Sequence, residues 1–119
     1  MQQVIQNEIF HGIKAHKAGN FDEAERVYRS ILQKHPNHPD ANHNLGVLNI
    51  SLNDADKSIP LFEIAIKSNP NIEQFWVSYI DALLKLEKYD EAKKAIQEGK
   101  KNGLTIVKAD IIEKNLNEN

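Results

Sequence analysis

The stretch AGNFDEAERVY, residues 18–28, decides the fold, because its key positions return twice further along the chain. The columns that recur at a constant spacing are Gly12/Gly46, Phe21/Ala55/Tyr89, Ala24/Ser58/Ala92, Tyr28/Phe62/Ile96 and Pro36/Pro70. In every column the residue number rises by the same amount, 34, from one occurrence to the next. A period that holds over several columns indicates a chain built from stacked structural units. It predicts three units, over about 5–38, 39–72 and 73–106, followed by a tail.

Each unit has the pattern of two helices joined by a short turn. In the middle unit, apolar residues recur at helical spacing from Ala41 to Leu52, and the polar pair Asn53-Asp54 interrupts them. A second apolar stripe then ends at Pro70, which cannot continue a helix. We expect Gly12 to lie against Ala24, and Tyr28 to fill the gap toward the next unit. One helix pair cannot bury both of its faces, so the units are predicted to stack into an all-α solenoid.

These residues resemble the tetratricopeptide repeat family. The matching positions are Gly12, Ala15, Gly19-Asn20-Phe21, Ala24, Tyr28 and Pro36, then Asn44-Leu45-Gly46, Ala55, Phe62, Ala65 and Pro70, then Trp76, Tyr89, Ala92 and Ile96. The third unit departs from the family pattern at Tyr79-Ile80 and at Gly99. The resemblance implies a right-handed superhelical solenoid of three helix-turn-helix repeats within residues 1–104.

Residues 105–119 are predicted to form a seventh, capping helix with a frayed end. Thr105 is placed to cap its N-terminus. Four apolar side chains, Leu104, Val107, Ile111 and Ile112, are expected to cover the third unit. Charged neighbours would then face water, as the outer face of a terminal cap does in soluble solenoids.

Composition excludes several classes of protein. The 119 residues contain no cysteine, which removes disulfides, thiolate metal sites and cysteine nucleophiles. The net charge is −2 and is spread evenly, so neither a nucleic-acid surface nor an acidic-membrane surface is expected. No apolar run approaches the roughly 20 residues that a membrane span needs. These features are typical of a cytoplasmic protein.

A search for catalytic and metal-binding motifs predicts no enzyme, no cofactor and no metal. His35, His38 and His43 are near one another in the sequence, but two of them lie in a turn and no carboxylate completes a ligand set. The glycines are isolated and form no phosphate-binding loop. Paired carboxylates such as Asp90-Glu91 lie where a second helix begins, and there they stabilise the positive helix end.

In the family, the first helix of each unit lines a concave face on which partners bind. The residues that we predict to line this groove are Gln6, Ile9, Phe10, Ile13, His43, Asn44, Val47, Ile50, Gln74, Val77, Ser78 and Asp81. Ile9 and Ile13 belong to an apolar stripe that is either open to a partner or packed against neighbouring repeats. Asn44 matches the asparagine column with which the repeat arms of protein glycosyltransferases bind a peptide backbone, or it is simply a solvated helix residue.

We therefore expect a non-catalytic protein–protein interaction module that binds a peptide segment or a helix of another protein in a partly apolar groove. One alternative is a regulatory or substrate-docking arm of a larger transferase. It is suggested because AGNFDEAE, residues 18–25, and the segment around Gly99 and Gly103 resemble repeat arms fused to bacterial glycosyl- or sulfotransferases. Another alternative is a scaffold that forms homo-oligomers through the apolar stripe.

Overall fold

Seven helices follow one another in the computed structural model of the protein, which describes residues 2–118. They are α1 Gln2–Lys17, α2 Phe21–Lys34, α3 Pro39–Ser51, α4 Ala55–Ser68, α5 Glu73–Lys85, α6 Tyr89–Lys100 and α7 Ile106–Glu118. No strand occurs within this range. The prediction of an all-α fold with a seventh helix is confirmed.

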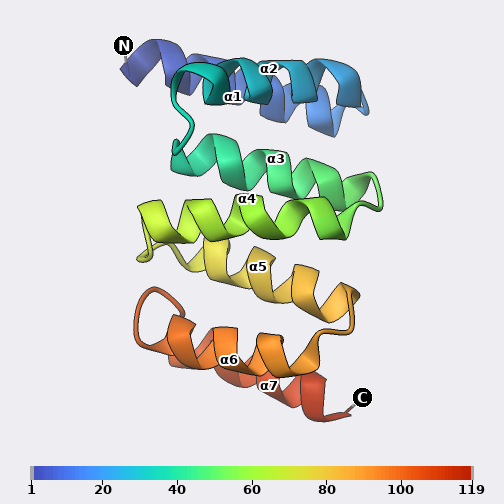
Figure 1. The fold of residues 1–119 in the computed structure, drawn as a ribbon, viewed down its shortest axis with the longest axis vertical. Helices are drawn as coiled ribbons and strands as arrows, with labels where there is room; N and C mark the ends of the chain where they lie inside the picture. The colour runs from blue at the N-terminus through green and yellow to red at the C-terminus, as the bar shows by residue number, and fades with distance from the viewer. Residues whose placement is uncertain (1, 119) are drawn as a thin grey trace.

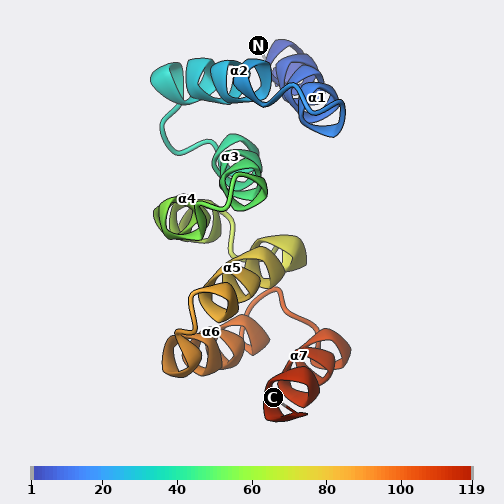
Figure 2. The ribbon, with the colours of Figure 1, turned by 90° about the vertical axis from the view of Figure 1, so that its right-hand side faces the viewer.

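The molecule measures 41 × 26 × 20 Å. The helices stack as antiparallel pairs along its longest dimension (Figure 1). In the described part of the chain, each helix contacts only helices one or two places away in the sequence. Figure 2 shows α1, α3 and α5 on one side of the stack and α2, α4 and α6 on the other. We call these sides the first-helix face and the second-helix face. This neighbour-to-neighbour packing is the arrangement of a solenoid.

The turn inside each helix pair has the same backbone conformation three times. Gly19, Asn53 and Glu87, which occupy equivalent positions in the three units, all adopt positive φ angles, of 79°, 61° and 58°. After each of them the next residue donates its backbone N–H to a carbonyl five residues back, as in Asn20 to Ala15 at 2.8 Å. A single residue in the left-handed conformation is a common way to end an α-helix, and the hydrogen bond that follows it satisfies one of the last carbonyls of the helix.

Two glycines allow the helices of a pair to approach closely. A Cβ added at Gly12 would lie 2.5 Å from Cε1 of Tyr28, and one added at Gly46 would lie 2.5 Å from Cε1 of Phe62. The nearest neighbour of Gly12 is therefore the Tyr28 ring, and the contact predicted between Gly12 and Ala24 stays a prediction. Tyr28 belongs to a buried cluster with Leu45 of the next helix pair, so the inter-unit packing expected for it is confirmed.

The cap helix α7 covers the third pair with a different set of side chains from the one predicted. Leu104 and Ala109 are buried, and Ile112 packs against them. Val107 and Ile111, however, remain 71% and 51% exposed, so the prediction that they cover the third pair is wrong. The helix begins at Ile106. Ala109, Ile112 and Leu116, which are three or four residues apart, lie on its inner side, and Val107 and Ile111 lie on its outer side.

Side-chain interactions hold α7 in place. The Thr105 backbone N–H donates to Glu73 Oε2 at 2.7 Å, and Lys100 Nζ lies 2.9 Å from Glu113 Oε1. Thr105 Oγ1 accepts the N–H of Lys108 at 3.2 Å, which confirms Thr105 as the N-cap. The end that was predicted to fray is helical as far as Glu118, and Asn119 lies outside the described residues.

Within residues 2–118, no helix is long and apolar enough to cross a lipid bilayer.

Candidate functional site

A pocket of about 550 Å³ opens on the first-helix face between α1 and α3. We call it the α1–α3 pocket. Its lining residues are Ile13, His16, Lys17, Gly19, Phe21, Tyr28, Asn44 and Val47. Three of the predicted groove residues, Ile13, Asn44 and Val47, are therefore brought together in one site.

The walls of this pocket combine apolar surface with a few polar groups. Ile13 and Val47 approach from the two first helices, and Phe21 contributes from α2; all three are partly exposed. The carboxamide of Asn44 lies among them, with Oδ1 3.3 Å from Nδ1 of His43. A mainly apolar cavity with a small number of oriented polar groups is the usual form of a binding site.

His16 and Lys17 form the end of the pocket near the α1–α2 turn. His16 Nε2 lies 2.8 Å from Oγ of Ser51, so this histidine connects α1 to the end of α3. Its ring contacts Phe21 edge to face, with the centroids 5.6 Å apart. Burial lowers the pKa of His16, which favours the neutral ring, and Lys17 lies beside it at this end of the pocket.

Tyr28 closes the base of the pocket and carries a polar atom that the fold does not satisfy. Its side chain is fully buried, and its hydroxyl has no hydrogen-bond partner among the described residues. Burial also raises the pKa of Tyr28 to about 12. From the sequence, Tyr28 was assigned to packing and Phe21 only to a recurring position of the repeat. The sequence carried no signal for a second role at either position.

Ile9 does not line an open groove, and that prediction is wrong. Its side chain is only 2% exposed because it packs against Val27 and Ile31 of α2 and Ala41 of α3. The neighbouring Phe10, which was also predicted to line the groove, is 59% exposed.

His43 and Ser78 are also buried, at 8% and 7% exposure, and the prediction that they line an open groove is wrong. His43 Nε2 lies 2.8 Å from Ser78 Oγ, and Gln74 Nε2 donates to the same oxygen at 3.2 Å. The His43 ring also stacks near Phe75, with centroids 4.9 Å apart. These side chains hold α3 against α5.

The remaining predicted groove residues lie outside the α1–α3 pocket. Gln6, Gln74 and Asp81 are exposed, and Ile50 and Val77 are partly buried. Asp81 forms an ion pair with Lys85 on its own helix at 3.3 Å. Their roles in binding stay predictions.

Stacked helix pairs with a pocket between consecutive first helices define a helical repeat protein. A family model described as tetratricopeptide repeat matches residues 15–76, and a second tetratricopeptide model matches residues 50–103. The chain belongs to the tetratricopeptide repeat family.

Solved structures with similar folds are distant in sequence. The tetratricopeptide domain of Sgt2 from Aspergillus fumigatus aligns with a TM-score of 0.78 and 18% identity, over 96% of this chain and 80% of that one. The TPR2B domain of yeast Sti1, solved in a complex with pHsp70, gives 0.73 and 15%, over 80% and 76%. At these identities the likeness concerns the fold. No protein of curated function matches the sequence.

Two longer proteins contain the same fold as a part. An O-GlcNAc transferase mutant from Thermobaculum terrenum aligns with a TM-score of 0.74 and 18% identity, over 82% of this chain but 19% of that one. The chain also spans only about half, 54%, of the MamA structure that it matches.

Proposed function

We propose that this chain is a non-catalytic protein-interaction module that binds a peptide segment or helix of another protein on its first-helix face. The observation that carries the proposal is the convergence of Ile13, Asn44 and Val47 around the α1–α3 pocket. Tetratricopeptide repeats are generally interaction modules, and this pocket supplies what a peptide requires. Apolar walls receive a side chain, and a carboxamide is placed to bond a peptide group.

Exposed apolar surface next to the pocket supports the same site. Phe10 lies one helical turn before Ile13 on α1, and its ring is more than half exposed. A bound segment could therefore continue from the pocket along α1. Exposed aromatic side chains beside an apolar pocket are typical anchors of protein interfaces.

The test is a binding screen followed by mapping. A set of capped 12-residue peptides with apolar residues at alternating positions is titrated while amide chemical shifts are followed by NMR. We expect shifts clustered on α1 and α3 for the peptides that bind. Val47→Asp and Asn44→Ala should weaken that binding, and Gln33→Ala, on the exposed surface of α2 and away from the first-helix face, is the control. Shifts confined to α2, α4 and α6 would reject this face as the binding site.

A docking arm within a larger transferase is a second candidate function. The observation that favours it is the fold similarity to 19% of the length of an O-GlcNAc transferase. In that case the α1–α3 pocket would position a protein substrate for a catalytic domain elsewhere. Reading the gene on both sides of the segment that encodes residues 1–119 tests this candidate, and a coding sequence without a transferase domain contradicts it.

Self-association is a third candidate, favoured by apolar side chains exposed at both ends of the stack. Val4 on α1 and Ile106, Val107 and Ile111 on α7 are all more than half exposed. Light scattering at increasing protein concentration tests this candidate. A mass that stays at 13.6 kDa would remove it.

A further inference from the structure

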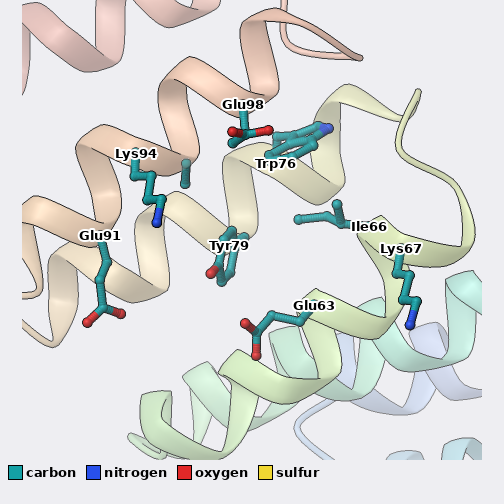
Figure 3. Close-up of a pocket in the computed structure, with 9 residues that line it drawn as sticks. Glu63, Ile66, Lys67, Trp76, Tyr79, Glu91, Lys94 and Glu98 are labelled. Carbon is teal, nitrogen blue, oxygen red and sulfur yellow. The ribbon is translucent and has the colours of Figure 1, made fainter.

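A second pocket lies on the second-helix face, in the other half of the molecule (Figure 3). It has a volume of about 460 Å³ and opens between α4 and α6, with side chains of α5 at its base. We call it the α4–α6 pocket. It is lined by Glu63, Ile66, Lys67, Trp76, Tyr79, Glu91, Lys94, Ala95 and Glu98, and it shares no residue with the α1–α3 pocket.

The base of this pocket is aromatic and held in place. Trp76 is only 6% exposed and donates its Nε1–H to the carbonyl of Pro70 at 2.7 Å. Gly99 brings α6 close to the indole, since a Cβ there would lie 3.3 Å from Cδ2 of Trp76. Tyr79 lies on the same helix, three residues later, and is partly buried beside it. The two rings therefore form a fixed apolar surface at the bottom of an open cavity.

The rim of the pocket carries more negative than positive side chains. Glu63 comes from α4, and Glu91 and Glu98 come from α6. None of these three carboxylates forms an ion pair within 4.0 Å among the described residues. Figure 3 shows Lys67 directed away from the aromatic rings. Lys94 is the lysine on the Tyr79 side of the cavity (Figure 3).

The carboxylates act on the base of the pocket. Burial raises the pKa of the Tyr79 hydroxyl, and the negative charges of Glu63 and Glu91 raise it further. These two side chains come from different helices, so the stacking of the fourth and sixth helices creates a negative potential at the Tyr79 hydroxyl. A cation entering the pocket would be attracted by that potential and by the face of an aromatic ring.

We propose that the α4–α6 pocket is a second partner-binding site, which takes an arginine side chain from a protein segment. The methylene stem packs on Ile66 and Trp76, and the guanidinium lies over Tyr79 between Glu63 and Glu91. Arginine fits better than lysine because its planar group stacks on aromatic rings and forms paired hydrogen bonds with carboxylates. This site goes beyond the peptide binding proposed for the first-helix face and uses different residues.

The test uses Trp76 as the reporter, because it is the only tryptophan in the chain and lines the pocket. Three capped seven-residue peptides are titrated into the protein; they differ only in a central arginine, glutamine or glutamate. We expect a saturable change in tryptophan emission with the arginine peptide and binding about tenfold weaker with the glutamine peptide. Equal responses to the arginine and glutamine peptides would overturn the proposal.

Variants of exposed rim residues locate the site and show whether the bound side chain is positively or negatively charged. Glu91→Gln should weaken arginine binding severalfold, and Lys94→Gln should strengthen it, because the positive charge of Lys94 on the pocket lining repels a bound guanidinium. Val47→Asp, in the α1–α3 pocket, is the matched control and should leave this binding unchanged. The proposed site would be contradicted if the protein preferred the glutamate peptide. It would also be contradicted if Lys94→Gln weakened binding of the arginine peptide, or if Val47→Asp abolished that binding. Far-ultraviolet circular dichroism verifies that every variant is folded.

Discussion

Asn42 and Trp76, which occupy equivalent positions in consecutive units, make the same hydrogen bond to a proline carbonyl. Nδ2 of Asn42 donates to Pro36 O at 3.0 Å, and Nε1 of Trp76 donates to Pro70 O at 2.7 Å. Two unlike side chains therefore close the equivalent turns between consecutive helix pairs. The two turns share the proline acceptor and the position of the donor, and the donor side chain differs.

Removing the Asn42 donor should destabilise the fold. Asn42 is buried and also donates to His38 O at 2.9 Å, so Asn42→Ala leaves two carbonyls without this partner. We expect the free energy of unfolding to fall by about 1–3 kcal/mol, measured by urea denaturation. Gln33→Ala, on the exposed surface of α2, is the control and should change it by less than about 0.5 kcal/mol. Similar values for the two variants would contradict the role of this bond.

Gly46→Ala should destabilise the protein although alanine is the better helix former. The new Cβ would lie 2.5 Å from the Phe62 ring, which is fully buried and cannot move away freely. We expect a loss of about 1–3 kcal/mol from overpacking. Gly99→Ala is the matched comparison, because its closest contact is a side-chain atom of Leu104 at 3.1 Å. Thermal unfolding should rank Gly46→Ala as the more damaging change, and the reverse order would refute the close-approach argument.

Glu87→Gly should stabilise the protein. Glu87 adopts a φ of 58°, which is unfavourable for a residue with a side chain and free for glycine. Gly19, at the equivalent position of the first pair, already has this advantage. After the larger chain entropy of glycine in the unfolded state is subtracted, we expect a gain of about 0.5–1 kcal/mol. The control Lys88→Gly alters the next residue, which has negative φ, and should give no gain in a chemical denaturation series.

Stability should fall as the pH decreases below about 6.5, the ordinary pKa of histidine. Burial lowers the pKa of His43 in the folded protein, while the Asn44 side chain and Asp40 raise it by smaller amounts. The unfolded chain therefore binds a proton more readily than the folded one between the two pKa values. The contribution of the His43 ring to stability is fully present above the pKa of the unfolded chain. It is lost as the pH falls from that value through the folded pKa, with a slope of at most about 1.4 kcal/mol per pH unit for one proton.

Unfolding measured between pH 7.5 and 5 tests this linkage. His43→Gln should reduce the slope of stability against pH. His16, whose pKa is also lowered by burial, contributes separately, so His16→Gln should remove a different part of it. An unchanged slope in both variants would show that neither ring is responsible.

Truncation of Ile9 should lower stability, whereas truncation of Phe10 should affect binding and leave stability nearly unchanged. Ile9→Ala opens a cavity among Val27, Ile31 and Ala41 and should cost about 2–5 kcal/mol. Phe10→Ala removes an exposed ring and should change stability by less than about 0.5 kcal/mol, while it weakens any partner bound along α1. Denaturation curves and a binding titration on both variants separate these effects. A stable Ile9→Ala would contradict the burial of that side chain.

The period of the sequence predicted most of the architecture because several positions that recur with it have a structural cause. The turn positions Gly19, Asn53 and Glu87 share one backbone conformation, and Gly12 and Gly46 share one close approach to an aromatic ring. These constraints are local, and so they can be recognised in the sequence. These recurring constraints allowed the positions of most helices and turns to be predicted.

The facing of individual side chains was harder to predict than the helices themselves. One residue corresponds to about 100° of rotation on a helix, so Ile9 and Phe10, both predicted to line the groove, lie on different sides of α1, one buried and one exposed. The buried pair of His43 and Ser78 depends on how α3 meets α5, and no local pattern contains that contact. The α4–α6 pocket was missed for the same reason, since its carboxylates come from helices of two different repeats.

Contacts confined to nearby helices have a mechanical consequence. Because α1 and α7 share no contact surface, a force applied between the two ends is carried in series through each successive interface. Such a molecule extends elastically by small tilts at every junction, and it gives way one hairpin at a time.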